Sequence, residues 1–390
     1  MALKNKSLRR ANAPVKDKIP LVSVIIPMYN SAKFIPQTLE SLLYQTMKDF
    51  EVVVVDDCST DNSVEVVEGF KPRFDSQAVK LHIVKLPKNT GTPGISRNLG
   101  INFACGKYIA FLDSDDLFTK TALEELTTLA EEYQAEIVRM YNHWVLWEEK
   151  ARFADDPAFT DMTALTNSAN WSLRSERPNA QLSAPVLISQ EISERLKLFL
   201  NQDVFWSSVV QFYRRDFLVS NKLSFSPMLK SEDAPFIFEC LLATEKYLLV
   251  PNVTYIVRPR LDSASRTNGQ QINLENYFHK NIAAWREGFN EFERVMKKFP
   301  FFSEHVNYRY AVLDFFFQRS FSRHAEMWMA YTQIPPFRLN ELVKREFHPD
   351  DAAFSAYLFN TVNVYRLQLM KFQQENLALK NELQKYRSAK

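Results

Sequence analysis

The sequence contains little glycine and little cysteine. Seven glycines occur in 390 residues, where an average protein has about 7%. The three cysteines are odd in number, lie far apart and form no CxxC pair (Cys58, Cys105 and Cys240), and the six histidines form no close pair. This pattern favours neither a disulfide framework nor a zinc site. A reducing cytoplasm is the simplest compartment for such a chain.

The chain also lacks a strong net charge and long apolar runs. Its 48 basic and 46 acidic residues leave a formal net charge of +2, so no overall field attracts nucleic acid. No apolar run approaches the roughly 18 residues of a membrane-spanning helix, and the N-terminus does not resemble a signal peptide. We therefore expect a soluble, cytoplasmic protein with no nucleic-acid partner. The basic residues 1–20 predict a solvated tail or, at most, a peripheral contact with the inner face of the cell membrane.

From residue 21 onward, short β-branched runs alternate with stretches long enough for helices, which is βαβα order. The runs VVVV and YIAFL are apolar at consecutive positions, as expected for strands buried on both faces of a parallel sheet. We predict a Rossmann-like α/β domain with a mainly parallel sheet, whose ligand binds outside the carboxyl ends of the strands. The expected strands are 22–26, 51–55, 81–85, 108–112 and 136–141, and the expected helices are 33–46, 62–70, 93–104 and 120–133.

The later part of the chain has a different character. Residues 150–190 lose the alternation and indicate a long excursion or a lid, 191–200 predict a helix, 203–250 resume a mixed pattern, and 272–345 predict an aromatic-rich helical region. The predicted organisation is a basic tail at 1–20, an α/β domain at 21–265, a helical appendage at 266–357 and a coiled coil at 358–390.

The coiled-coil prediction comes from a heptad repeat near the C-terminus. With Val362 at an a position, the following d and a positions are all apolar except Asn376 (Tyr365, Leu369, Phe372, Asn376, Leu379, Leu383 and Tyr386). One Asn at an a position favours a parallel two-stranded coiled coil. The g residues Glu375 and Glu382 then face the e residues Lys380 and Arg387 of the partner. We expect a homodimer; the alternative is a lone amphipathic helix docked on its own chain, because fewer than four heptads is marginal.

Three aspartates follow a predicted buried strand: Asp113, Asp115 and Asp116. Carboxylates this close repel one another unless a cation neutralises them. Oxygen ligands suit Mg²⁺ or Mn²⁺, which commonly bind one or two carboxylates together with substrate phosphates. A metal-bound diphosphate would follow. The alternative is a solvated turn in which Asp116 caps the next helix, with Thr121 and Glu124 forming a capping box.

Four of the seven glycines lie close together (Gly91, Gly94, Gly100 and Gly106). Glycine occurs where the backbone needs a positive φ or approaches another group closely, and these glycines lie within or beside the helix predicted at 93–104, which carries Arg97. That arginine could pair with a phosphate or brace the aspartates, while Gly91 and Gly94 could instead serve a helix cap. Neither GxxxxGK[ST] nor GxGxxG occurs here, which argues against a P-loop and a dinucleotide site.

Two other predicted strands end in residues that suit a nucleotide base. Tyr29, near Pro27, offers a flat ring for stacking, and Asp57 offers a carboxylate that can accept a pyrimidine N3–H. Each residue taken singly is better explained by rim packing or by helix capping. Together with the aspartates, they outline a nucleotide pocket.

Four segments resemble, in order and spacing, successive motifs of the bacterial family 2 inverting glycosyltransferases, which have the GT-A fold. They are VSVIIPMYN at 22–30, VVVVDDCSTDNS at 52–63, NTGTPGISRNLG at 89–100 and KYIAFLDSDD at 107–116. SEDAPFIFECLLA at 231–243 resembles a later acidic motif of the family. The resemblance covers about the first 265 residues and implies a nucleotide-binding half at 21–140 and an acceptor and catalytic half at 141–265. One departure is Met28, which follows Pro27 where the family has a smaller residue.

The resemblance also implies roles at the donor site. Pro27 and Tyr29 would line a uracil pocket, Asp57 would bind the base, and Arg97 would help to hold the nucleotide. Asp113, Ser114 and Asp115 match the DXD motif, in which the second acid coordinates the metal on the donor diphosphate and the first meets the ribose or the metal. Arg260, Ser263 and Ser265 resemble the loop that closes over the donor phosphates, with a plain linker as the alternative.

Asp233 matches the catalytic base of the family. The alternative is that Glu232 and Asp233 only begin a helix capped by Ser231. The resemblance thus implies a Mn²⁺- or Mg²⁺-dependent hexosyl- or N-acetylhexosaminyltransferase that moves a sugar from a UDP-sugar to a hydroxyl of a surface polysaccharide, a lipid-linked glycan or a glycoprotein. Two other hypotheses remain. A nucleotidyltransferase-like enzyme would not need Asp233, and a non-catalytic assembly subunit would not need intact Asp115 and Asp233.

Overall fold

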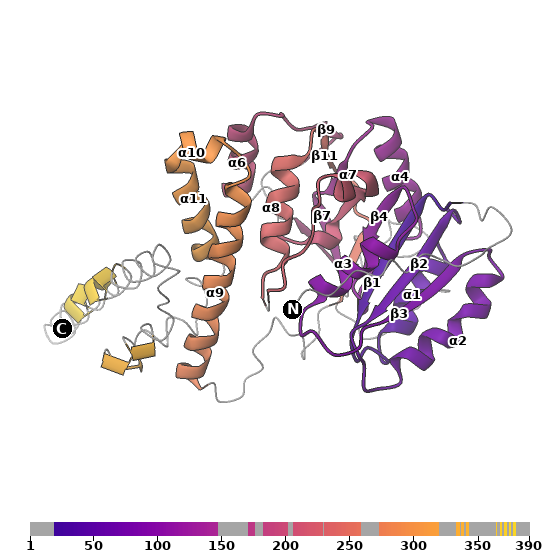
Figure 1. Ribbon diagram of the computed structural model, residues 1–390, viewed down its shortest axis with the longest axis horizontal. Coiled ribbons are helices and arrows are strands. Elements are labelled where there is room, and N and C mark those ends of the chain that lie inside the picture. Colours follow the sequence, from indigo (N-terminus) through magenta and orange to yellow (C-terminus); the bar gives the residue numbers. More distant parts are fainter. Residues whose placement is uncertain are drawn as a thin grey trace, which may run out of the picture.

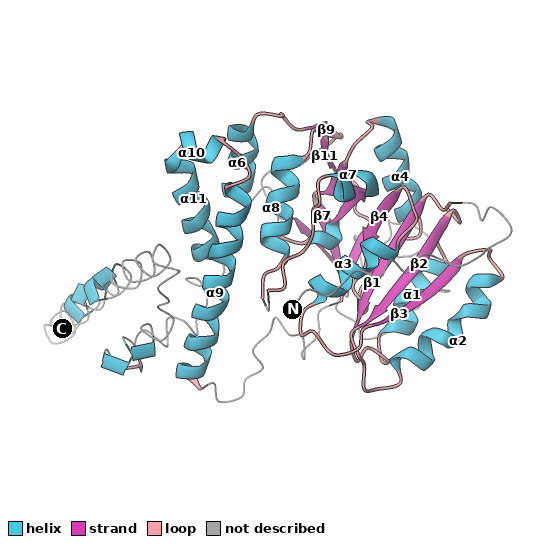
Figure 2. Cartoon of the chain, in the orientation of Figure 1, coloured by secondary structure: helices cyan, strands magenta, loops and turns pink. Residues whose placement is uncertain are grey.

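The computed structural model describes residues 19–146, 171–175, 182–201, 206–228, 230–258 and 273–319, with single residues and short runs between 333 and 379. Figure 1 shows a twisted sheet with its helices on one side of the molecule. The long helix α9 (Leu274–Met296) lies on the other side with α10 (Phe301–Glu304) and α11 (Val306–Phe317). Figure 2 separates the same regions by secondary structure.

The first part of the chain forms the predicted βαβα unit. The elements are β1 (Val22–Met28), α1 (Ile35–Leu43), β2 (Phe50–Asp56), α2 (Ser63–Asp75), β3 (Lys80–Lys85), α3 (Pro93–Phe103) and β4 (Tyr108–Phe111). Every residue of β1, β2 and β4 is buried, as their apolar runs predict. These strands pair in parallel in the order β3-β2-β1-β4, so their carboxyl ends share one edge of the sheet.

The rest of the α/β region completes this sheet and adds a smaller one. It contains β5 (Leu117–Phe118), α4 (Ala122–Glu132), β6 (Ile137–Met140), β7 (Asn142–Leu146), β8 (Trp171–Ser175), β9 (Val186–Leu187), α6 (Ile192–Leu200), a 3-10 turn at Ser208–Val210, β10 (Gln211–Arg214), α7 (Arg215–Ser220), α8 (Asp233–Ala243), β11 (Tyr247–Val250) and β12 (Tyr255–Val257). Among the described residues, the large sheet runs β3-β2-β1-β4-β10-β6-β11-β9 and the small one β5-β12-β7-β8.

Strand β10 enters the large sheet against the direction of its neighbours. It pairs antiparallel with both β4 and β6, so β10 begins at the edge where the parallel strands end. Local periodicity did not reveal this insertion, because it depends on a pairing between distant segments. Of the excursion predicted at 150–190, the described part includes β8, which pairs with β7, and β9, at the edge of the large sheet.

The aromatic region after residue 272 is helical, as predicted: α9 (Leu274–Met296), α10 (Phe301–Glu304) and α11 (Val306–Phe317). Its phenylalanines join the core of the α/β region. The ring of Phe292 on α9 lies 5.1 Å from Phe238 on α8 and 4.9 Å from Phe316 on α11. A Cβ at Gly288 would lie 2.1 Å from the Phe316 ring, so this glycine permits the close approach of α9 and α11.

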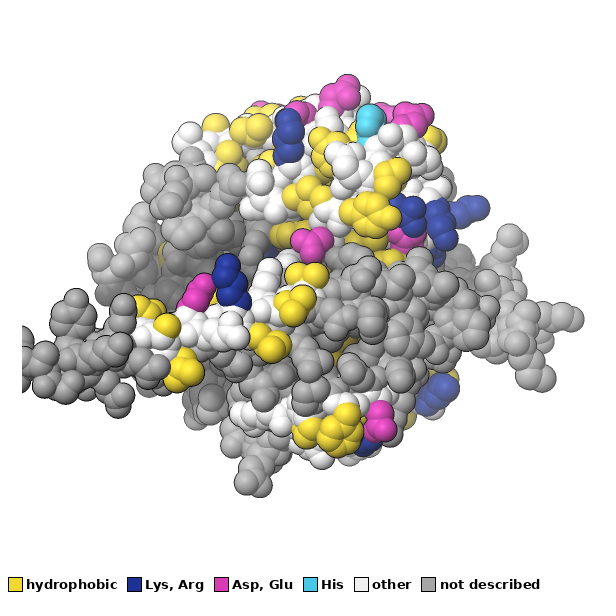
Figure 3. Space-filling model, turned by 90° about the vertical axis from the view of Figure 1, so that its left-hand side faces the viewer, with side chains coloured by type: hydrophobic (Ala, Val, Ile, Leu, Met, Phe, Trp, Pro, Cys, Tyr) yellow, Lys and Arg dark blue, Asp and Glu magenta, His cyan; other side chains and the backbone are white. Residues whose placement is uncertain are grey.

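The residues described in the C-terminal tail are helical, and several of them expose large apolar side chains by 50–67% (Val364, Leu367, Met370, Phe372, Leu377 and Leu379). Asn376 lies outside the described residues. Figure 3 shows the side of the molecule on which this tail lies, with apolar side chains at the surface. Within the described ranges, no helix combines the length and the apolar character needed to cross a bilayer. All three cysteines are free.

Candidate active site

The carboxyl ends of β1, β2 and β4 bring most of the predicted site residues to one edge of the sheet. Pro27 lies in β1, Asp57 follows β2, and Asp113 and Asp115 follow β4. Arg97 reaches this edge from α3, and Asp233 reaches it as the first residue of α8. Arg260, Ser263 and Ser265 lie outside the described residues.

A pocket of about 330 Å³ opens beside β1 and β2. Its lining includes the three residues predicted to meet a base, together with the loop before α3 (Pro27, Met28, Tyr29, Asp57, Asn89, Gly91, Thr92, Pro93 and Ser96). Tyr29 is 47% exposed, so its ring is accessible to a ligand. Asp57 accepts hydrogen bonds from the Thr90 backbone N–H at 2.9 Å and from the Thr90 hydroxyl at 3.0 Å, which fixes the carboxylate in the pocket wall.

The glycine cluster has two structural causes. Gly91 has a φ of 75°, and the Thr92 side chain after it caps α3 by accepting from the Gly94 N–H, so the helix-cap interpretation of this loop is correct. A Cβ at Gly100 would lie 2.3 Å from Ile25 Cγ2, and one at Gly106 would lie 2.6 Å from the Ser23 backbone nitrogen. These last two glycines permit the close packing of α3 and its following turn against β1.

Arg97 is the centre of a charge network. Its side chain is 4% exposed and pairs with Asp113 at 2.9 Å, with Asp233 at 3.1 Å and with Glu232 at 3.3 Å. Burial would lower the pKa of Arg97, but the charges of Asp233, Asp113 and Glu232 outweigh it and raise this pKa above its ordinary value. Of the two roles left open by the sequence, the structure shows Arg97 bracing the acids.

Asp113 and Asp115 stand in a loop that other residues hold in place. The neighbouring Asp116 is buried and accepts from the Tyr255 hydroxyl and from the Arg258 N–H, both at 2.8 Å. Arg258 also donates to the Asp115 carbonyl. Burial first, and then the charges of Asp115 and Asp113, raise the pKa of Asp116 well above its usual range. Sequence reasoning missed Tyr255, and it placed Arg258 only in the segment that resembles the loop over the donor phosphates. The pairing of β12 brings both residues to the acidic loop.

The capping alternative for Asp116 was wrong. Helix α4 has Thr121 as its N-cap without a side-chain cap bond. The Thr121 hydroxyl donates to Glu125 instead, and Glu124 accepts from the Thr46 hydroxyl at 2.5 Å. Ser114 is buried, and its hydroxyl shares a 2.7 Å hydrogen bond with Ser31. The serine of the DXD-like motif is therefore bonded within the protein.

The donor set at this loop suits a hard divalent cation that is shared with a substrate. The described residues contain no group of three or more His, Cys, Asp or Glu side chains arranged to hold a metal ion. Asp113 and Asp115 are both partly exposed, and their charges raise the pKa of Asp116. One or two carboxylates completed by phosphate oxygens match the way Mg²⁺ commonly binds.

The acidic pair at the start of α8 occupies the other side of Arg97. Glu232 rather than Ser231 is the N-cap, without a side-chain cap bond. Burial and the charge of Asp233 raise the pKa of Glu232 to about 7. The Asp233 carboxylate is 20% exposed and accepts from the Ser208 hydroxyl at 2.9 Å and the Ser208 N–H at 3.3 Å. Asp233 therefore begins a helix, as the alternative interpretation expected, but Ser231 is not its cap. Asp233 also belongs to the charge network, and its role as a base stays a prediction.

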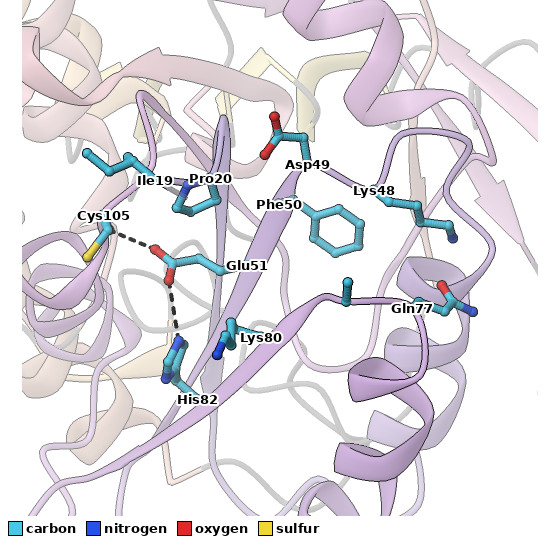
Figure 4. A pocket seen from close by; sticks show the side chains of 11 residues that line it. Ile19, Pro20, Lys48, Asp49, Phe50, Glu51, Gln77, Lys80, His82 and Cys105 are labelled. Atoms are coloured by element: carbon cyan, nitrogen blue, oxygen red, sulfur yellow. Dashed lines mark hydrogen bonds and ion pairs between the residues drawn. The ribbon is translucent and has the colours of Figure 1, made fainter. Parts of the chain in front are cut away.

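A second pocket, of about 490 Å³, lies at the opposite edge of the sheet, where β2 and β3 begin (Figure 4). Its buried Glu51 accepts from the Ser23 hydroxyl and the Cys105 N–H, both at 2.7 Å, and pairs with His82 at 3.4 Å. Burial would raise the pKa of Glu51, but these hydrogen bonds outweigh it and lower the pKa. Glu51 thus ties the strands together far from the acids after β4.

Comparison with known proteins agrees with this arrangement. Residues 23–161 match the sequence family described as glycosyl transferase family 2. The chain is 26% identical over 295 residues to the uncharacterized glycosyltransferase YibD of Escherichia coli, with 74% of this chain and 76% of YibD covered. It is 29% identical to the uncharacterized glycosyltransferase EpsJ of Bacillus subtilis, with 63% of each chain covered.

A third relative is the poly(ribitol-phosphate) beta-N-acetylglucosaminyltransferase TarS of Staphylococcus aureus, 38% identical over 118 residues, which are 30% of this chain and 20% of TarS. The chain thus spans less than two thirds of EpsJ and a fifth of TarS. The crystal structure of TarS 1–349 in complex with UDP-GlcNAc has a similar fold, with a TM-score of 0.57, 20% identity and coverage of 91% of this chain and 92% of that one.

Proposed function

Residues 23–161 match glycosyl transferase family 2, and on this basis we propose that the chain transfers a sugar from a UDP-sugar to an acceptor hydroxyl with inversion. One observation carries the proposal. The pocket lined by Pro27, Tyr29 and Asp57 lies at the same sheet edge as Asp113, which Arg97 joins to Asp233. The proposed base-binding pocket and the proposed catalytic carboxylate thus lie at one edge of the sheet.

The pocket suits a pyrimidine nucleotide. Tyr29 can stack on the base, and Asp57, held by Thr90, can accept its N3–H. Uracil carries that proton at neutral pH. The binding of UDP-GlcNAc by TarS 1–349 supports a UDP-sugar donor here.

The reaction needs charge stabilisation at the leaving group and a base at the acceptor. Asp115, with Asp113, would hold Mn²⁺ or Mg²⁺, which when bound neutralises the charge on the departing diphosphate. Asp233 takes the proton of the acceptor hydroxyl as its oxygen attacks the anomeric carbon. The new C–O bond forms as the bond to the phosphate oxygen breaks, UDP leaves with the electron pair, and attack from the far side inverts the anomeric centre.

The acceptor we propose is a hydroxyl of a bacterial glycan: a surface polysaccharide, a lipid-linked glycan or a glycoprotein. The name of TarS, a poly(ribitol-phosphate) transferase, supports a polymeric acceptor. A cytoplasmic location fits the three free cysteines.

The test measures UDP released from a panel of UDP-sugars with Mn²⁺, Mg²⁺ or EDTA. We expect metal-dependent release by wild type and a loss of at least about 100-fold in Asp115→Ala and Asp233→Asn. Asp75→Asn is the matched control, because this aspartate is exposed at the end of α2. Release that survives Asp233→Asn would favour the nucleotidyltransferase hypothesis, and no turnover with any donor would favour an assembly subunit.

We also propose that residues 358–390 form a parallel homodimer. The support is the exposure of apolar side chains on the described helical residues and the opposite charges at the g and e positions in the sequence. Leu379 lies at d and is 57% exposed, whereas Leu367 lies at f and is 67% exposed. These two leucines therefore provide a matched pair.

Light scattering of the full chain should give a dimer, and a chain ending at Tyr357 should give a monomer. Leu379→Asp should dissociate the dimer and Leu367→Asp should leave it intact. Equal behaviour of the two variants, or a monomeric wild type, would refute the coiled coil.

A further inference from the structure

Ser208 holds both oxygens of the proposed base. Its hydroxyl donates to Asp233 Oδ1 at 2.9 Å and its backbone N–H donates to Oδ2 at 3.3 Å. Arg97 adds a third hydrogen bond, from Nη1 to Oδ1 at 3.1 Å. We propose that Ser208 is a positioning residue that orients the Asp233 carboxylate and keeps it ionised; this inference rests on the proposed function.

The fold explains how Ser208 reaches Asp233. Ser208 is fully buried and opens the 3-10 turn that leads into β10. Because β10 runs against β4 and β6, this turn lies at the edge where the parallel strands end. A parallel strand at the same place would begin at the opposite edge and could not bring the serine to the base.

The helical region supports the same segment. The ring of Trp206, two residues before Ser208, packs against Phe315 at 5.5 Å and Phe316 at 5.7 Å on α11, and lies 6.0 Å from Phe199 on α6. On the other side, the Tyr213 hydroxyl donates to the Ser208 carbonyl at 3.4 Å. The serine is therefore held both by the sheet and by the helices.

The two oxygens of Asp233 differ as a result. Among the residues that the structure describes, Oδ1 receives two donors, from Ser208 and Arg97, whereas Oδ2 receives the longer Ser208 N–H contact alone. Oδ2 thus keeps more of its accepting capacity for an acceptor hydroxyl. If the carboxylate turned so that both of its oxygens faced Arg97, its hydrogen bonds to Ser208 would break.

Ser208 also acts on the charge of the base. Burial raises the pKa of Asp233, Arg97 lowers it, Asp113 raises it, and the two Ser208 hydrogen bonds lower it. Within the described part of the chain, Glu232 and the Tyr213 hydroxyl also interact with this carboxylate. Removing the Ser208 hydroxyl takes away a donor that stabilises the ionised form.

The test is the pH profile of kcat/KM for UDP-sugar turnover by full-length Ser208→Ala. A base must be ionised, so the acidic limb reports its pKa. We expect this limb to move to higher pH by about one unit, with UDP affinity in calorimetry unchanged. Ser208→Cys, which keeps the shape but donates weakly, should shift the limb by less.

The control is Ser41→Ala, which also removes a fully buried hydroxyl, one that donates to the Thr38 carbonyl at 2.7 Å in α1. It should leave the acidic limb in place. A Ser208→Ala limb that coincides with that of wild type would overturn the inference, as would an equal shift in Ser41→Ala. An inactive wild type would instead overturn the proposed function itself.

Discussion

Replacement of Arg97 by Met should destabilise the fold, and more so at high pH. The substitution keeps an apolar stem of similar length but removes the cation that Asp233, Glu232 and Asp113 share. Breaking a buried ion pair by removing one partner typically costs about 3–5 kcal/mol. We expect that loss in the free energy of unfolding at pH 8. Asp113 adds little to it, because its side chain is 35% exposed and water screens its charge.

The loss should shrink as the pH falls. In wild type, burial and Asp233 already raise the pKa of Glu232 to about 7, and Asp233 is raised as well. A carboxyl group with a folded pKa above its unfolded value contributes its full stability below the unfolded pKa and loses it as the pH rises through the folded pKa. Without Arg97 the pKa values of Glu232 and Asp233 rise further, so both acids are more fully protonated at pH 5. The difference in unfolding free energy between wild type and Arg97→Met should therefore fall to about 1–2 kcal/mol at that pH.

The assay is urea-induced unfolding of both proteins at pH 5, 6, 7 and 8. The control is Arg73→Met, whose partner Glu40 and whose own side chain are substantially exposed; it should change stability by less than about 0.5 kcal/mol at every pH. An Arg97→Met deficit below about 1 kcal/mol, or one that does not vary with pH, would refute the reasoning that one cation stabilises these buried acids.

Three further outcomes can be measured. Glu51→Gln should lower the free energy of unfolding by about 2 kcal/mol at pH 7, because the fold lowers the pKa of Glu51 and the ionised carboxylate stabilises it. This stabilisation is lost as the pH falls through that pKa, so the unfolding free energies of wild type and variant should converge in acid. A difference that stays constant with pH would contradict this. Gly100→Ala should lower the free energy of unfolding by about 1–3 kcal/mol, because its Cβ would clash with Ile25. Gly69→Ala, which faces open space in α2, should be neutral or stabilising. Thermal unfolding compares the two variants, and equal effects would count against the packing explanation. Tyr29→Ala should weaken UDP binding in calorimetry about 10-fold without lowering the melting temperature, because the ring is 47% exposed; unchanged affinity would remove Tyr29 from the site.

The first βαβα unit of the α/β region was predictable from local pattern. Strands such as β1 and β2 appear within two residues of their predicted ends, because consecutive apolar residues can be buried only in a covered sheet. The polar residues that follow these strands could also be placed at one edge, since parallel strands end together. Tyr255, Arg258 and Ser208 could not be placed in this way, because nothing in their neighbourhood in the sequence indicates which strand they will lie beside.

The sequence by itself determined the order of strands and helices from β1 to β4, the resemblance to a family, and the residues that stand at the ends of β1, β2 and β4. These features depend on periodicity and on motifs within a few residues of one another. Only the tertiary structure decided which charges meet. Arg97 contacts Asp233 across 136 positions of the chain, and Ser208 reaches the same carboxylate because β10 is antiparallel. Such contacts depend on long-range pairing and burial. The same burial reduces hydration of the acids, so their protonation also depends on the fold.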